Sequence, residues 1–196
     1  MNNTKTTLSR EEVIKKLASK KSEITDIINK VYTSFSQKTP QKFNTNCGLN
    51  YRHGCPTLTV EQAITTLAFV KGNRIPSVKN VIEKMADFIL AGNRFNPVTI
   101  NLSTSGTMDG QHRLLAFIVL NEMKDELEDL FKNKFSYDNL GIYVDDYGTG
   151  EIELKAIRDM QKGKTWTGYD QISSLLELND ENAQNLFSAA SDIFNK

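Results

Sequence analysis

The chain has 196 residues, with 24 basic and 24 acidic side chains, 39% hydrophobic residues and two cysteines. A chain of this length buries roughly 70% of the surface that its unfolded form exposes, so it needs neither disulfides nor a structural metal to fold. The balanced charge excludes a global basic field for nucleic acid, and any DNA contact would need a local basic patch.

The longest uninterrupted apolar runs span only a few residues, whereas a helix that crosses a membrane needs about 20. The N-terminal stretch MNNTKTTLSREE is polar and lacks the apolar core of a signal peptide. We therefore expect a cytoplasmic protein without a membrane partner.

Residues 9–35 carry a helical pattern. Ser9 and Glu12 have the spacing of a capping box, and apolar residues then recur at helical intervals. The polar run SKKSE (19–23) is a candidate break between two helices. The apolar stripe is expected to pack on the rest of the chain or on a partner, which includes a homodimer through this helix. The lysines form its solvated face or a DNA-contacting patch: Lys15, Lys16, Lys20 and Lys21.

Residues 39–56 show no clear period, which predicts a loop-rich connection or a short hairpin. Cys47, His53 and Cys55 suggest a metal site, but their spacing fits no common zinc motif and lacks a nearby fourth ligand. We expect two reduced loop thiols instead. With the preceding helical segment, these residues form a predicted N-terminal extension over residues 1–56.

Helices and short strands follow. Thr59 and Gln62 form a second capping box that begins a helix in VEQAITTLAFVKG, which Gly72 is placed to end. Another helix is predicted in VKNVIEKMADFILAG, with Gly92 as its stop. The stretch PVTINL (97–102) alternates apolar and polar residues and predicts a strand, STSG predicts a turn, and TM (107–108) predicts a short return strand.

The C-terminal part predicts a helix from Gly110 to about Phe131 and a strand over 140–146. Helical stretches then follow in EIELKAIRDMQKG, in QISSLLEL and over about 180–195. This order predicts an α+β fold, in which helices wrap a small mixed sheet and extend from it at both ends.

The stretch DGQHR (109–113) concentrates reactive groups between a strand and a helix. Gly110 allows a sharp turn and close approach of a ligand. The first N–H groups of the helix lie at the positive end of its dipole, which predicts an anion site. Arg113 adds a bidentate donor for phosphate, and His112 can donate to a phosphoryl oxygen or shuttle a proton. Asp109 is placed to bind a cation or a hydroxyl group.

Each of these residues also has an ordinary structural interpretation. Asp109 can cap the helix, His112 can be a half-buried histidine with satisfied hydrogen bonds, and Arg113 can pair with Asp109 or Glu122. Their concentration in five consecutive residues favours a functional site.

Other residues are candidates for supporting roles. Asn73 and Arg74 supply a second phosphate contact, or a helix cap beside a surface arginine. Lys164 reaches a phosphate and Trp166 stacks on a base, unless the tryptophan anchors its loop to the core. Asp145 and Asp146 hold Mg²⁺ or form a turn before Gly148.

The run MDGQHRLLAF (108–117) resembles the Asp-Gly-Gln-His-Arg signature of the ParB/sulfiredoxin-like superfamily, in its small phage and mobile-element branch. KGNR (71–74), FILAGNRFNPVTINL (88–102) and IRDMQKGKTWTGYDQI (157–172) resemble flanking elements of that branch. The resemblance implies a ParB/sulfiredoxin-like domain over residues 57–176, with a C-terminal helix over 177–196 packed on it.

In sulfiredoxins the corresponding run is Gly-Cys-His-Arg, and Gln111 replaces the reactive cysteine here, so sulfinic-acid reduction is not expected. In the chromosome-partition ParB proteins the run is Gly-Glu-Arg-Arg in a CTP-binding pocket, and Gly110 and Arg113 match it. The resemblance implies a protein that binds a nucleoside triphosphate, ATP or CTP, with Mg²⁺ in a DNA-related process, and it leaves hydrolysis or phosphoryl transfer open.

We accordingly assign three residues to catalysis (Asp109, His112 and Arg113), with Asp109 also as metal ligand, and five to the nucleotide (Gly110, Gln111, Asn73, Arg74 and Lys164). Two other functions stay open. One is a non-catalytic DNA-binding or regulatory protein that grips backbone phosphate with the same motif and lysines 15, 16, 20, 21, 162 and 164. The other is a module that acts on a host protein through residues 9–35.

Overall fold

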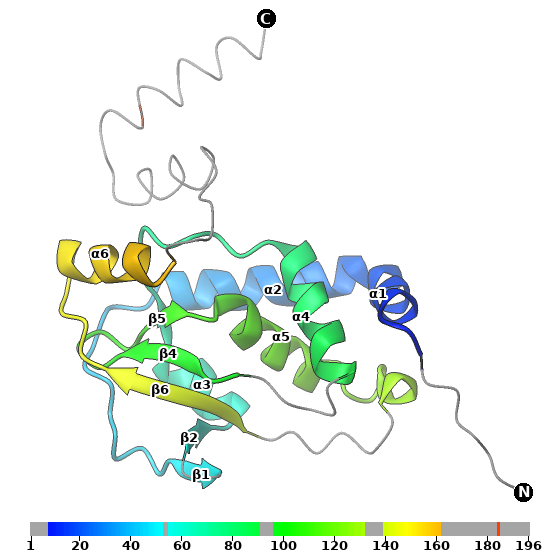
Figure 1. Cartoon of the computed structure of the whole chain (residues 1–196), viewed down its shortest axis with the longest axis horizontal. Helices are drawn as coiled ribbons and strands as arrows, with labels where there is room; N and C mark the ends of the chain where they lie inside the picture. Colours follow the sequence, from blue (N-terminus) through cyan, green and yellow to red (C-terminus); the bar gives the residue numbers. More distant parts are fainter. Residues whose placement is uncertain (1–7, 53–54, 91–95, 132–138, 162–183, 185–196) are drawn as a thin grey trace, which may run out of the picture.

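The computed structural model describes residues 8–52, 55–90, 96–131, 139–161 and 184. The helices α1 (Arg10–Ser19) and α2 (Lys21–Ser36) come first, followed by strands β1 (Asn50–Arg52) and β2 (Cys55–Leu58). Next come α3 (Val60–Thr66), β3 (Ala68–Phe69), α4 (Val78–Leu90), β4 (Val98–Asn101) and β5 (Gly106–Asp109). The described chain ends with α5 (Gln111–Glu122), a 3-10 turn (Glu128–Leu130), β6 (Leu140–Asp145) and α6 (Glu151–Met160) (Figure 1).

The six described strands form one mixed sheet in the order β1-β2-β6-β4-β5-β3. Strand β4 runs parallel to β6 and antiparallel to β5, and β3 runs parallel to β5. The antiparallel pair β1 and β2 joins the sheet through β6, which confirms the hairpin that was one of two expectations for this region. The mixed sheet and its surrounding helices confirm the predicted α+β class.

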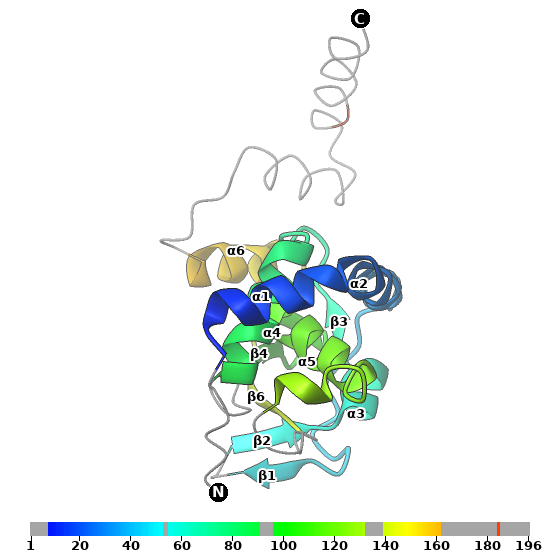
Figure 2. The same cartoon turned by 90° about the vertical axis from the view of Figure 1, so that its right-hand side faces the viewer.

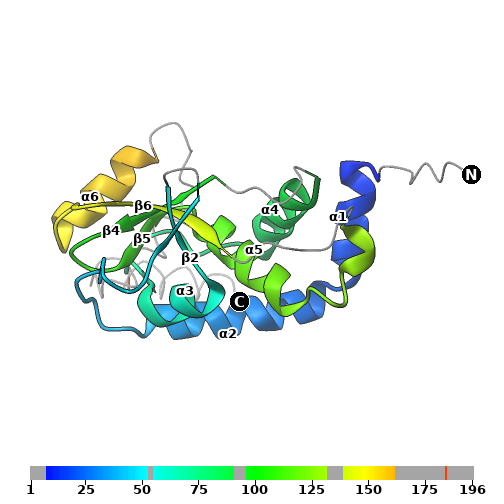
Figure 3. The same cartoon turned by 90° about the horizontal axis from the view of Figure 1, so that it is seen from below.

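Apolar side chains pack on both faces of the sheet. Helix α6 covers one face, where Leu154 and Ile157 meet Val70 and Met108, and α2 and α3 lie on the other side (Figure 3). Helix α5 is the centre of the larger core, and every residue from Leu114 to Leu120 is fully buried. A helix that is apolar all round must be covered on all sides, which explains why so many helices gather around α5.

Helices α1 and α2 belong to this same core. The Ser9–Glu12 capping box is confirmed, and the predicted break falls at Lys20. Buried residues of the stripe such as Leu17 and Ile28 join the central cluster, and α1 packs on α4 (Figure 2). The apolar stripe is therefore used within this chain, which removes the observation that suggested a homodimer.

The predicted helix over residues 60–72 is wrong in its second half. Its Thr59–Gln62 capping box is confirmed, but α3 ends at Thr66 and residues 68–69 pair with β5 as strand β3. Lys38 from the segment after α2 donates hydrogen bonds to the carbonyl oxygens of Ile64 and Leu67. The Lys38 ammonium group thus satisfies carbonyl groups at the end of α3. This contact could not be predicted from residues 60–72, because Lys38 lies outside them.

The helix expected to reach Phe131 is also shorter than predicted. Helix α5 ends at Glu122, and the chain continues through turns into the 3-10 turn at Glu128–Leu130. These turns place two acidic residues beside lysines of the N-terminal helices. Lys20 Nζ, at the C-terminal end of α1, lies 2.6 Å from Glu126 Oε2. Lys16 Nζ, within α1, lies 2.9 Å from Asp129 Oδ2. The helix predicted from the apolar periodicity therefore ends before the segment that contacts the N-terminal helices.

Replacing Lys38 with methionine is expected to lower the free energy of unfolding by about 1–3 kcal/mol, because two carbonyls lose a charged donor. Methionine keeps an apolar stem near the Phe35 ring, whose centroid lies 4.5 Å from Lys38 Nζ. Lys30→Met on the exposed face of α2 is the control. Urea denaturation measures both, and equal midpoints for the two variants would show that the carbonyl contacts do not stabilise the fold.

No helix in the described part of the chain is long and apolar enough to cross a membrane. Cys47 and Cys55 are free thiols.

Candidate functional site

The predicted anion site lies where β5 passes into α5. Thr107 pairs with Ile100 and Asp109 with Thr99, so β5 has Met108 as one extra residue, a β-bulge. Gly110 follows with a φ of +93°, and a Cβ atom there would lie 2.8 Å from Val98 Cγ1. The left-handed backbone and the close neighbour both require glycine, which confirms the sharp turn expected at this residue.

The N-terminus of α5 differs from those of α1 and α3. Those two helices have capping boxes, whereas α5 begins at Gln111 after the N-cap residue Gly110, which offers no side-chain cap. Its first turn opens into a cleft of about 540 Å³. The cleft is lined by residues of the loop after β3, of α4 and of the DGQHR stretch, including Arg74, Lys84, Asp109, His112 and Arg113. The N–H groups of a helix start and its dipole favour an anion here.

Arg113 is tied to protein groups in this first turn. Its Nη2 atom lies 2.8 Å from Asp109 Oδ2, and its Nη1 donates to the carbonyl oxygens of Asn96 (3.2 Å) and Pro97 (2.9 Å). The pairing with Asp109 is one of the two structural pairings considered from the sequence. Three of the five guanidinium N–H donors are thus used to join α5 to β5 and to the segment before β4.

His112 connects the starts of two helices. Its Nε2 atom accepts a hydrogen bond from the Ser77 N–H at 3.2 Å, and Ser77 Oγ in turn accepts from the Asn80 N–H at the start of α4. An accepting Nε2 means a neutral imidazole with its proton on Nδ1. His112 is half-buried, as the structural interpretation of this residue expected.

Asn73 lines the cleft and makes hydrogen bonds to the elements around it. It is buried, and its Nδ2 donates to the carbonyl oxygens of Thr107 and Met108 at 3.3 and 3.4 Å. Its Oδ1 accepts from the Arg74 N–H and from Gln161 Nε2. The two bonds from Nδ2 hold the loop after β3 against β5, and the bond from Gln161 ties the loop to the C-terminal end of α6. Asn73 therefore acts as a positioning residue for the loop that carries Arg74. It does not cap a helix, since α3 has already ended.

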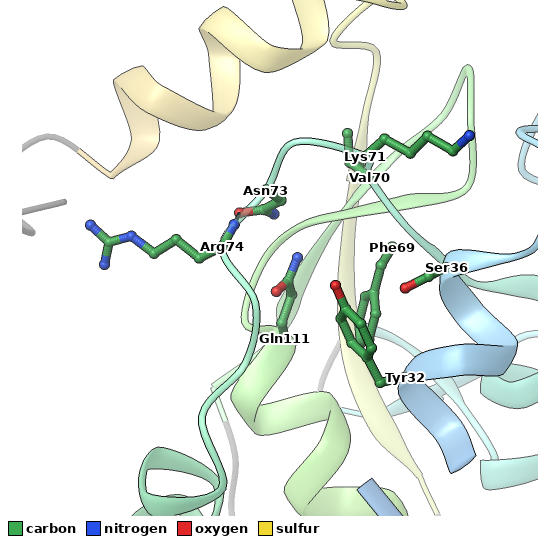
Figure 4. A pocket seen from close by; sticks show the side chains of 8 residues that line it. All are labelled: Tyr32, Ser36, Phe69, Val70, Lys71, Asn73, Arg74 and Gln111. Carbon is green, nitrogen blue, oxygen red and sulfur yellow. Dashed lines mark hydrogen bonds between the residues drawn. The ribbon is translucent and has the colours of Figure 1, made fainter. Parts of the chain in front are cut away.

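Gln111 lies between the cleft and a second cavity, and it lines both. It is 6% exposed and lines this smaller cavity with Tyr32, Ser36 and Phe69 (Figure 4). Sequence reasoning placed Tyr32 on an apolar stripe and did not single out Ser36. The only signal was a polar residue one helical turn after Tyr32, at a position where the stripe would continue.

The remaining predicted residues do not join this site. Lys164 and Trp166 lie outside the described residues. Asp145 is the last residue of β6, which is parallel to β4, and Asp146 follows it, whereas Asp109 ends β5, which is antiparallel to β4. They therefore lie at the opposite end of the strands. Hydrogen bonds from the Gly148 N–H and the Ser103 hydroxyl lower the pKa of Asp146, as suits the turn interpretation.

Few carboxylates at the site are available to bind a metal ion. Among the described residues, no group of three or more His, Cys, Asp or Glu side chains is arranged to hold a metal ion. Asp109 and Glu83 are the carboxylates that line the cleft, and Asp109 is paired with Arg113. Mg²⁺ commonly uses one or two carboxylates together with phosphate oxygens and waters, so these residues suit a metal that arrives with a nucleotide.

Comparison of the chain with models of protein families, with curated proteins and with solved structures gave no match.

Proposed function

We propose that this protein binds a nucleoside triphosphate, ATP or CTP, through its phosphate groups at the N-terminus of α5. The observation that carries the proposal is the helix start without a side-chain cap, which opens into the 540 Å³ cleft beside Arg74 and His112. A twelve-residue helix supplies oriented N–H groups and a dipole, and the arginine supplies a full positive charge.

The proposed roles of the side chains follow from their contacts. Arg74 neutralises phosphate charge, and His112 donates to a phosphoryl oxygen through Nδ1, because Nε2 is held by Ser77. Arg113 acts mainly as a positioning residue, with two N–H donors beyond its contacts to Asp109 and the two carbonyls. Mg²⁺ bound with the nucleotide would neutralise phosphate charge beside Asp109.

Binding has more support here than turnover. A base or a metal-bound role for Asp109 competes with its ion pair to Arg113, at 2.8 Å. We therefore propose nucleotide binding as the function, and hydrolysis or phosphoryl transfer in a DNA-related process as a separate prediction that phosphate release would detect.

The alternative functions draw less support from the described residues. Lys16 and Lys20, two of the six lysines of the suggested DNA track, pair with Asp129 and Glu126 of this chain. The apolar stripe of residues 9–35, suggested as a surface for a host protein, is largely buried on the chain's own core.

Calorimetric titration with ATP, CTP, GTP and ADP in the presence of Mg²⁺ tests the proposal. We expect saturable binding of at least one nucleotide and a loss of about 10- to 100-fold in affinity for Arg74→Ala, which removes a charge-assisted contact. Lys79→Ala is the matched control, because Lys79 is exposed on α4 and does not line the cleft.

Arg74 is a better probe than Arg113, whose removal also breaks contacts that hold the fold. The proposal fails if the unmodified protein shows no saturable binding of any of the four nucleotides. It also fails if the Arg74 and Lys79 variants lose the same affinity.

A further inference from the structure

The smaller cavity adjoins the phosphate cleft. The two share Asn73, Arg74 and Gln111 as lining residues, so a ligand that extends from one reaches the other past the first residue of α5. The smaller cavity has a volume of about 130 Å³. An engineered protein cavity of about 150 Å³ accommodates benzene, so this space suits one six-membered ring.

Aromatic rings form one wall of the cavity. Tyr32 of α2 and Phe69 of β3 pack with their ring centroids 5.4 Å apart, and Phe35 meets Phe69 edge-on at 5.2 Å. These rings are fixed by the packing of α2 against β3, since Phe35 and Phe69 both belong to the central core. Such a wall offers a stacking surface to a flat ligand.

Polar groups face the same space. In Figure 4 the amide of Gln111 points into the cavity beside the Tyr32 hydroxyl, and the structure gives this amide no hydrogen bond to another described residue. The Ser36 hydroxyl oxygen is buried, and no described residue provides it with a hydrogen-bond partner. Buried polar groups are ordinarily satisfied, so the Ser36 hydroxyl indicates a ligand that can hydrogen-bond to it. The Gln111 amide, which faces the same cavity, offers a donor and an acceptor to that ligand.

We infer that this cavity is the base subsite of the nucleotide site, an inference that rests on the proposed function. A ring of the nucleobase lies against Tyr32 and Phe69, and its polar edge meets the Gln111 amide and the Ser36 hydroxyl. The phosphates then lie at the N–H groups that follow Gly110. Helix α2, which lies outside residues 57–176, therefore supplies part of the ligand site.

Ser36→Ala separates a role in binding from a role in stability. The Ser36 hydroxyl has no described protein partner to lose, so thermal stability is expected to stay unchanged or to rise. Affinity for the tightest-binding nucleoside triphosphate is expected to fall roughly 2- to 10-fold, the equivalent of one hydrogen bond. Ser34→Ala, exposed on the same helix, is the control that leaves affinity unchanged.

Inorganic tripolyphosphate with Mg²⁺, which has no base, is the second ligand. We expect Ser36→Ala and Gln111→Leu to bind tripolyphosphate as the unmodified protein does, while both weaken binding of the nucleotide. The inference is overturned if both variants bind the nucleotide normally, or if they weaken the two ligands equally. In either case the protein still binds tripolyphosphate, with full or uniformly reduced affinity, so only the base subsite is ruled out. If the unmodified protein binds neither ligand, the proposed function fails as well.

Discussion

Asn101→Leu is expected to lower the free energy of unfolding by about 3–5 kcal/mol. Asn101 is fully buried at the end of β4 and makes four hydrogen bonds. Its Nδ2 donates to the Gly148 carbonyl (2.8 Å) and to Glu153 Oε1 (2.7 Å), and its Oδ1 accepts from the N–H groups of Ser103 and Tyr147, both at 3.1 Å. Leucine has a similar size but can make none of these bonds.

The loss extends beyond the amide itself. Glu153 of α6 is 6% exposed and receives hydrogen bonds from Asn101 and from the Thr104 hydroxyl, so leucine leaves a buried carboxylate with one donor fewer. Urea denaturation followed by circular dichroism measures the effect. Asn29→Leu, exposed on α2, is the control and is expected to change stability by less than about 0.5 kcal/mol. Similar midpoints for the two variants would contradict the role given to Asn101.

Gly110→Ala is expected to lower the free energy of unfolding by about 2–5 kcal/mol and to abolish phosphate binding. Alanine must adopt a φ near +93° there, and its Cβ would lie 2.8 Å from Val98 Cγ1 and 2.9 Å from Arg113 Nη2. The guanidinium would have to move from Asp109 and from the carbonyls that it holds. The first turn of α5 would then lose its geometry at the point where the proposed phosphates bind.

Gly48→Ala separates backbone strain from collision. Gly48 has a φ of +74°, but nothing lies within 4 Å of its Cβ position, so only the strain of about 1–2 kcal/mol applies. Chemical denaturation of both variants, with nucleotide titration of each, gives the comparison. Equal destabilisation would show that Val98 and Arg113 yield without cost, and retained nucleotide affinity in Gly110→Ala would place the phosphates elsewhere.

The elements that the sequence predicted well are those with local signals. The capping boxes at Ser9 and Thr59 are both formed, and the break at Lys20 matches a polar run. Strand β3 could not be predicted in this way, because Ala68 and Phe69 are a strand only through their pairing with β5. The end of α3 involves the Lys38 ammonium group, which comes from another part of the chain.

The site shows the same division. The pairing of Asp109 with Arg113 could be anticipated because the two residues are four positions apart in the sequence, with Asp109 at the end of β5 and Arg113 in the first turn of α5. The carbonyl contacts of Arg113 and the supporting role of Asn73 depend on the tertiary packing of loops. The cavity beside Gln111 is lined partly by α2, which is distant from Gln111 in the sequence, and the sequence of α2 contains no motif that predicts the cavity.

The burial of α1 and α2 around α5 has a consequence for how this protein can change over evolution. The core of the described chain extends beyond residues 57–176, the domain predicted from the sequence. A recombination event that transferred residues 57–176 alone would expose apolar residues of α5 that α2 now covers, and it would remove Tyr32 and Ser36 from the smaller cavity. The N-terminal helices and the DGQHR stretch must therefore be inherited together, and substitutions that pack across α2 and α5 should vary in concert.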